Sequence, residues 1–105
     1  MNVFILKNGN LNGNTSNVIG KMKDFYNAIN EFKESYDELI VDIMDDKTEW
    51  KVIKITLRSS PECGLLVEIN ADQEHESLRM CVLERVQFGY TSTSSIMNSL
   101  SDCFD

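Results

Sequence analysis

The chain has 105 residues, of which 42% are hydrophobic and 26% charged, which indicates a single folded domain spanning residues 1–105 and excludes a disordered chain. Seventeen acidic residues against ten basic ones give a net charge of −7, which argues against nucleic acids and anionic membranes as partners. No segment approaches the ~20 apolar residues of a membrane-spanning helix, and the N-terminus lacks a signal-peptide pattern, so we expect a cytoplasmic protein.

The first predicted element is a strand over residues 2–6, which include the apolar residues Val3, Phe4 and Ile5. Residues 8–14 then contain four asparagines and two glycines, two residue types that tolerate positive φ and therefore mark turns. A hairpin tip and a flexible loop are equally compatible with this composition.

Residues 18–36 carry the strongest periodic signal, because apolar side chains recur at alternating steps of four and three. We predict a long helix that begins at N-caps among residues 15–17 and ends between residues 31 and 36. Packing in a core is the favoured interpretation of this stripe over an exposed partner-binding face. The residues that form it are Val18, Met22, Phe25, Ile29, Phe32 and Tyr36.

Four further strands are predicted over residues 39–44, 49–59, 65–69 and 78–85, because each has β-branched or alternating apolar residues between polar turns. The acidic stretch after residue 44 is expected to be a turn. The run of serine and threonine over residues 91–95 predicts a loop that caps a short C-terminal helix. The fold class is therefore α+β: a twisted antiparallel sheet of four to five strands, with one long N-terminal helix packed on a face and a short C-terminal helix.

Catalytic, cofactor and metal motifs are not found in the sequence. His75 is the single histidine and lies between two glutamates, whereas zinc sites need paired ligands at short spacing. Cys63, Cys81 and Cys103 are odd in number and far apart, so we expect reduced thiols rather than a disulfide framework. No nucleotide-binding glycine loop or nucleophile motif is present. We therefore expect a protein that is not an enzyme and holds no cofactor or metal.

Acidic residues concentrate between positions 31 and 49, where eight acidic residues against two lysines give a local charge of −6. Carboxylates beside an aromatic anchor are typical of a surface that binds a basic protein. The alternative is a solvated helix end and turn with Trp50 in the core. The candidate partner-binding residues are Glu34, Asp37, Glu38, Asp42, Asp45, Asp46, Glu49 and Trp50.

In size, acidity and predicted α+β organisation, the whole chain resembles the immunity proteins of bacterial toxin systems, and phage-encoded nuclease inhibitors share the same description. The resemblance implies a small protein that binds and blocks a basic toxin, such as a nuclease, whose cleft must attract phosphate. The alternative is a non-catalytic structural or adaptor subunit, as a homodimer, that associates through a strand edge or the aromatic helix face. Burial of that helix face within one chain would argue against the adaptor.

Overall fold

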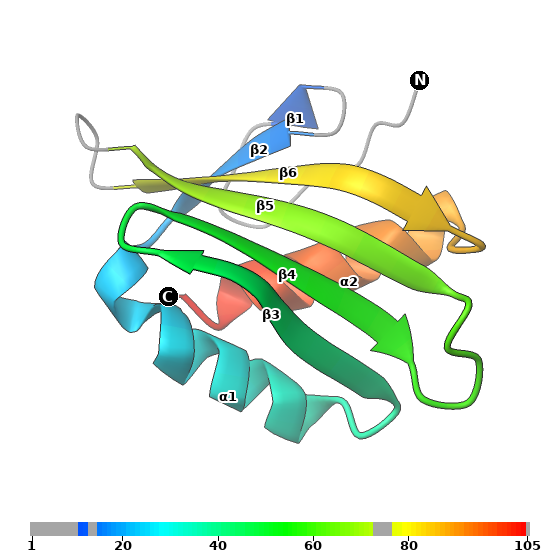
Figure 1. Cartoon of the computed structure of the whole chain (residues 1–105). Helices are drawn as coiled ribbons and strands as arrows, with labels where there is room; N and C mark the ends of the chain where they lie inside the picture. Colours follow the sequence, from blue (N-terminus) through cyan, green and yellow to red (C-terminus); the bar gives the residue numbers. More distant parts are fainter. Residues whose placement is uncertain (1–10, 13–14, 73–76, 105) are drawn as a thin grey trace.

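The computed structural model describes residues 11–12, 15–72 and 77–104, which form an α+β domain (Figure 1). A single antiparallel sheet has the strand order β1-β2-β6-β5-β4-β3. The strands are β1 (Leu11–Asn12), β2 (Thr15–Ile19), β3 (Leu39–Lys47), β4 (Trp50–Leu57), β5 (Gly64–Asp72) and β6 (Ser77–Val86). The helices are α1 (Phe25–Ser35), which follows the 3-10 turn η1 (Met22–Asp24), and α2 (Tyr90–Asp102).

The four long strands β3 to β6 confirm the strands predicted over residues 39–85. Alternate residues point to opposite faces of each strand, so one face of the sheet collects the apolar set. On β5 this set is Leu65, Val67 and Ile69, all of them buried. Both helices add their buried side chains to the same core cluster, so they cover one face of the sheet (Figure 1). We call this the covered face and the opposite one the open face.

The expected N-terminal helix is shorter than predicted. The stripe from Phe25 to Phe32 is buried in α1, and the helix ends at Ser35, within the predicted range. Residues 15–19, however, form β2 instead of the helix start, with Val18 directly opposite Leu78 of β6. The step of four from Val18 to Met22 imitates a helical period, whereas pairing with β6 decides the conformation.

Gly20 separates β2 from the helical segment and lies against Phe104, which follows α2. A Cβ atom placed at Gly20 would lie 2.9 Å from the Cβ of Phe104. No side chain larger than hydrogen fits at this distance without movement. The glycine therefore allows the end of β2 to pack against the buried Phe104 ring after α2.

The C-terminal helix is longer than expected. The Ser/Thr run over residues 91–95 belongs to the first turns of α2 rather than to a preceding loop. Thr93 is fully buried, as are Met97 and Leu100 of the same helix. Tertiary packing therefore holds the Ser/Thr run in a helix despite its weak helical propensity. Sequence periodicity located only the apolar second half of this helix.

Three earlier expectations fall outside the described residues: the strand over 2–6, the turn over 8–10 and 13–14, and the position of His75. The sheet extends beyond β6 through β2 and the two-residue β1. Within the described ranges, no helix has the length and apolar character needed to cross a membrane.

Candidate functional site

The candidate acidic residues lie along one edge of the sheet and at its two ends. β3 is the last strand in the order, so its outer edge has no neighbouring strand among the described residues. Nine residues of strand extend over about 30 Å. Asp37 and Glu38 precede β3, Asp42 and Asp45 lie within it, and Glu49 lies in the turn that follows. The sequence segment is therefore one long edge rather than one compact patch.

Four exposed acidic residues lie in β3 on its open-face side or in the turn before it: Asp37, Glu38, Asp42 and Asp45. We call them the acidic edge. Their carboxylates form no ion pair among the described residues, although Lys54 lies opposite Asp42 on β4. Glu34 is also exposed and is the last residue but one of α1.

The turn that carries the first two members of the acidic edge is fixed by Arg58. The Arg58 backbone N–H donates to the Glu38 carbonyl at 2.9 Å, and its Nε donates to the Asp37 carbonyl at 3.1 Å. These bonds leave the two carboxylates exposed while holding the backbone beneath them. The strand edge and the turn therefore present their charges from an ordered backbone.

An irregularity in β3 sends neighbouring acids to opposite faces. The register between β3 and β4 shifts between Ile43 and Asp45, so Met44 is an extra residue in the strand. Asp45 then lies opposite Val52 on the open face, and Asp46 lies opposite Lys51 on the covered face. β3 also continues to Lys47, so the predicted turn over residues 45–48 is wrong, and the turn comprises only Thr48 and Glu49. Pairing with β4 stabilises this acidic stretch as strand despite its low β-propensity.

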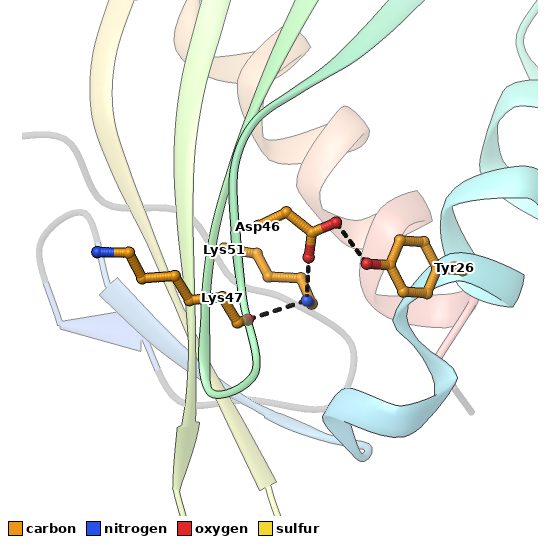
Figure 2. Close-up of polar contacts among 4 residues, drawn as sticks. All are labelled: Tyr26, Asp46, Lys47 and Lys51. Carbon is orange, nitrogen blue, oxygen red and sulfur yellow. Dashed lines mark hydrogen bonds and ion pairs between the residues drawn. The ribbon is translucent and has the colours of Figure 1, made fainter.

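Asp46 belongs to a polar network between the β3–β4 hairpin and α1, drawn in Figure 2. Lys51 forms an ion pair with Asp46 and donates to the Lys47 carbonyl at 2.9 Å. The Tyr26 hydroxyl donates to the other carboxylate oxygen of Asp46. The Lys51 ammonium also lies 5.1 Å from the ring centre of Phe25 and 5.2 Å from that of Tyr26. The network therefore fastens the hairpin to the first turn of α1.

The network changes the protonation equilibria of its three members. The hydrogen bond from Lys51, aided by the one from Tyr26, lowers the pKa of Asp46. The hydrogen bond to Asp46 raises the pKa of Tyr26. Burial alone would lower the pKa of Lys51, but the hydrogen bond and charge of Asp46 outweigh it, so this pKa is raised. At neutral pH the network consists of a carboxylate, an ammonium and a neutral phenol.

This arrangement is suited to holding structure rather than to proton transfer or nucleophilic attack. A nucleophilic lysine needs a lowered pKa, and that of Lys51 is raised. Its side chain is only 5% exposed, and its donors are directed to Asp46 and the Lys47 carbonyl. The hollow beside it, about 550 Å³ in volume, is lined by Tyr26, Asp46, Lys51 and neighbouring residues, and these three side chains are already hydrogen-bonded within the network.

Trp50 lies on the open face, apart from Asp46. Its indole N–H donates to the Glu68 carboxylate at 2.8 Å, and the Lys47 ammonium lies 5.2 Å from its ring centre. The side chain is half-buried. Trp50 and Asp45 thus share a face of the sheet, whereas Asp46 faces α1.

Sequence reasoning missed Tyr26 and Lys51, although Lys51 left a signal. Lys51 shares the side of β4 that carries Ile53 and Ile55, the buried positions of the alternating pattern. A lysine at a core position needs a partner for its charge. The search for that partner leads to Asp46, four positions before the strand begins.

Within the described ranges, no group of three or more histidine, cysteine or carboxylate residues is placed to hold a metal ion. Cys63, Cys81 and Cys103 are free and half-buried. Burial raises the pKa of Cys103 to about 11, so its reactive thiolate is scarce at neutral pH.

Comparison of the chain with protein-family models, with curated proteins and with solved structures finds no match.

Proposed function

We propose that this protein binds and blocks a basic protein partner, in the manner of an immunity protein that neutralises a nuclease-like toxin. The observation that carries the proposal is the acidic edge. Its carboxylates are exposed on an ordered backbone and lack basic partners within the described chain, so they are available to an incoming lysine or arginine. A net charge of −7 adds long-range attraction that speeds such an encounter.

The acidic edge also favours a different protein over a second copy of the chain as its partner. Charged side chains on an edge strand discourage edge-to-edge pairing, because two identical edges bring like charges together. A basic partner reverses the sign of that interaction. The proposed partner is therefore a basic protein. The compartment that we propose for the chain is the cytoplasm.

The aromatic helix face, one of the two contact surfaces that the adaptor alternative could use, is largely buried. Phe25 and Phe32 are fully buried, and Tyr36 is half-buried against the core. Tyr26 is 50% exposed, but its hydroxyl is bound to Asp46. The adaptor alternative therefore rests on the outer edge of β3, and the acidic side chains along that strand support the inhibitor proposal over pairing of two identical edges.

The proposal is tested by co-expressing the tagged chain with each protein encoded beside its gene, and a basic protein among them is the candidate partner. We expect the two proteins to co-purify at low ionic strength, and we expect raised salt to slow their association. Inhibition of the partner's activity by the purified chain completes the test. A partner that is equally active with and without the chain contradicts the proposal.

Charge reversal then locates the binding surface. Asp45→Lys changes the charge by the same amount as Glu31→Lys, an exposed position on α1 whose charge acts on Cys103 near the end of α2. We expect Asp45→Lys to slow association about tenfold or more and Glu31→Lys to have a much smaller effect. Asp46→Lys is unsuitable, because it would place a second ammonium beside Lys51. Equal effects of the two reversals would assign the attraction to net charge alone.

A further inference from the structure

The open face contains an apolar hollow that neither α1 nor α2 covers. Its volume is about 410 Å³, and it is lined across four strands by residues that include Met44, Thr56, Leu66 and Val86. In register, Val86 of β6 lies opposite Gly64 of β5, and Gly64 lies opposite Thr56 of β4. Gly64, which has no side chain, therefore lies between the side chains of Thr56 and Val86. This arrangement leaves a depression in the sheet surface.

Close packing of the strands holds this depression open. A Cβ atom at Gly64 would lie 3.1 Å from the Thr56 Cγ2 atom and 3.2 Å from the Ile55 carbonyl oxygen. A side chain therefore does not fit there without displacing its neighbours. The hollow is built into the register of β4, β5 and β6.

Apolar side chains border the hollow and remain in contact with solvent. Met44 is 55% exposed and Val86 is 41% exposed, and both belong to its lining. The other end of the open face differs, because Trp50 lies there with Lys47 over its ring and Glu68 bound to its N–H. Large apolar groups left exposed around a depression are typical of a docking surface.

The charges around the hollow are mainly acidic. Glu62 and Glu84 line it, and the single lysine of the lining is Lys54, which lies opposite Asp42 of the acidic edge. Across the strands, Asp42, Lys54, Leu66 and Glu84 form one row in register. The apolar floor at Leu66 thus has carboxylates at both ends of its row.

We infer that this hollow receives an apolar side chain of the basic partner, flanked on the partner's surface by lysine or arginine residues. The inference rests on the proposed function and names its anchoring subsite. Burial of an apolar side chain supplies affinity that charge alone does not, because exposed ion pairs contribute little. The neighbouring carboxylates select a basic surface around that anchor.

Two synthetic peptides serve as probes: a pentapeptide with leucine between two pairs of lysines, and the same peptide with serine in place of leucine. Each is titrated into the ¹⁵N-labelled full-length chain and followed by amide chemical shifts. We expect the leucine peptide to bind about threefold to tenfold more tightly, with the largest shifts at Gly64, Leu66 and Val86. Equal affinities, or shifts that avoid these amides, overturn the inference.

A matched pair of variants separates the hollow from general electrostatics. Val86→Lys and Leu83→Lys introduce the same charge on β6 at positions of similar exposure, but only Val86 lines the hollow. We expect Val86→Lys to abolish the preference for the leucine peptide and Leu83→Lys to retain it. Loss of the preference in both variants, or in neither, overturns the inference.

Asp45→Lys tests the proposed function separately with the same peptides. Weaker binding of both peptides to this variant supports the acidic edge as the source of attraction. If that weakening occurs while Val86→Lys and Leu83→Lys behave alike, the hollow is rejected and the acidic edge stands. If Asp45→Lys binds both peptides as the unaltered chain does, the acidic edge is rejected and the Val86 comparison decides on the hollow.

Discussion

Each face of the sheet has a hollow at its surface, and the side chains that line the two hollows differ in character. On the covered face, the wall made by Tyr26, Asp46 and Lys51 is internally hydrogen-bonded. On the open face, the hollow at Gly64 has exposed apolar borders at Met44 and Val86. Polar groups that are hydrogen-bonded to one another stabilise the fold, whereas apolar surface left in contact with solvent is available to a partner. Whether the lining side chains already have partners within the chain therefore distinguishes the two hollows better than their volumes do.

The strongest test of this contrast compares core truncation with truncation on the open face. Phe32→Ala removes a fully buried ring between α1 and the sheet, and we expect it to lower the free energy of unfolding by about 3–5 kcal/mol. Met44→Ala should change it by no more than about 0.5 kcal/mol, because Met44 is mostly in solvent. Urea denaturation measures both. A large loss on Met44→Ala would mean that the open face also supports the fold.

The polar network provides a second comparison, between two lysines of β4 that point to opposite faces. Lys51→Met keeps an apolar stem but removes the donor to Asp46 and to the Lys47 carbonyl, so we expect a loss of about 1–2 kcal/mol in the free energy of unfolding. Lys54→Met, at an exposed position, should change it by less than about 0.5 kcal/mol. Equal effects in thermal unfolding would remove the structural role assigned to Lys51.

A smaller loss is expected at the floor of the open hollow. Gly64→Ala should lower the free energy of unfolding by about 1 kcal/mol, because the added methyl group crowds Thr56 Cγ2. Thr56→Ser removes that methyl group, so Gly64→Ala should cost less in the Thr56→Ser background. A double-mutant cycle by urea denaturation measures the difference. Strict additivity would show that Thr56 is not the obstacle.

Measuring the free energy of unfolding at different pH values tests the network without altering its packing. Because the folded pKa of Asp46 is lowered from its ordinary value of 3.8, its contribution is present above that value and is lost as the pH falls below it. The pKa of Lys51 is raised above 10.5, so its contribution is present below that pH and is lost as the pH rises further.

The stability difference between the unaltered chain and Asp46→Asn should therefore be flat around neutrality and shrink at both extremes. Thermal unfolding across the pH range measures this difference. Asp42→Asn is the control, since it lies on the same strand but outside the network. A pH-independent difference for Asp46→Asn would contradict the assigned pKa shifts.

Sequence periodicity identified the elements whose local pattern and tertiary environment agree. The four long strands and the end of α1 were predicted because alternating or helical spacing coincides with the buried set, as in Leu65, Val67 and Ile69. The acidic segment was also found, since charge can be counted without a structure. The division of this segment into an acidic edge and the network around Asp46 could not be predicted. The extra residue Met44 reverses the face of the sheet to which each following side chain of β3 points.

By itself, the sequence determined the α+β class, the acidic character and the absence of familiar catalytic motifs, because composition and short-range periodicity are properties of neighbouring residues. Only the tertiary structure decided that Val18 belongs to a strand, that Asp46 is bound by Lys51 while Asp45 is exposed, and that Gly64 forms the floor of a hollow. Each of these outcomes depends on which strand lies alongside which and in what register. Those pairings join residues far apart in the chain, whose mutual energies no local pattern records.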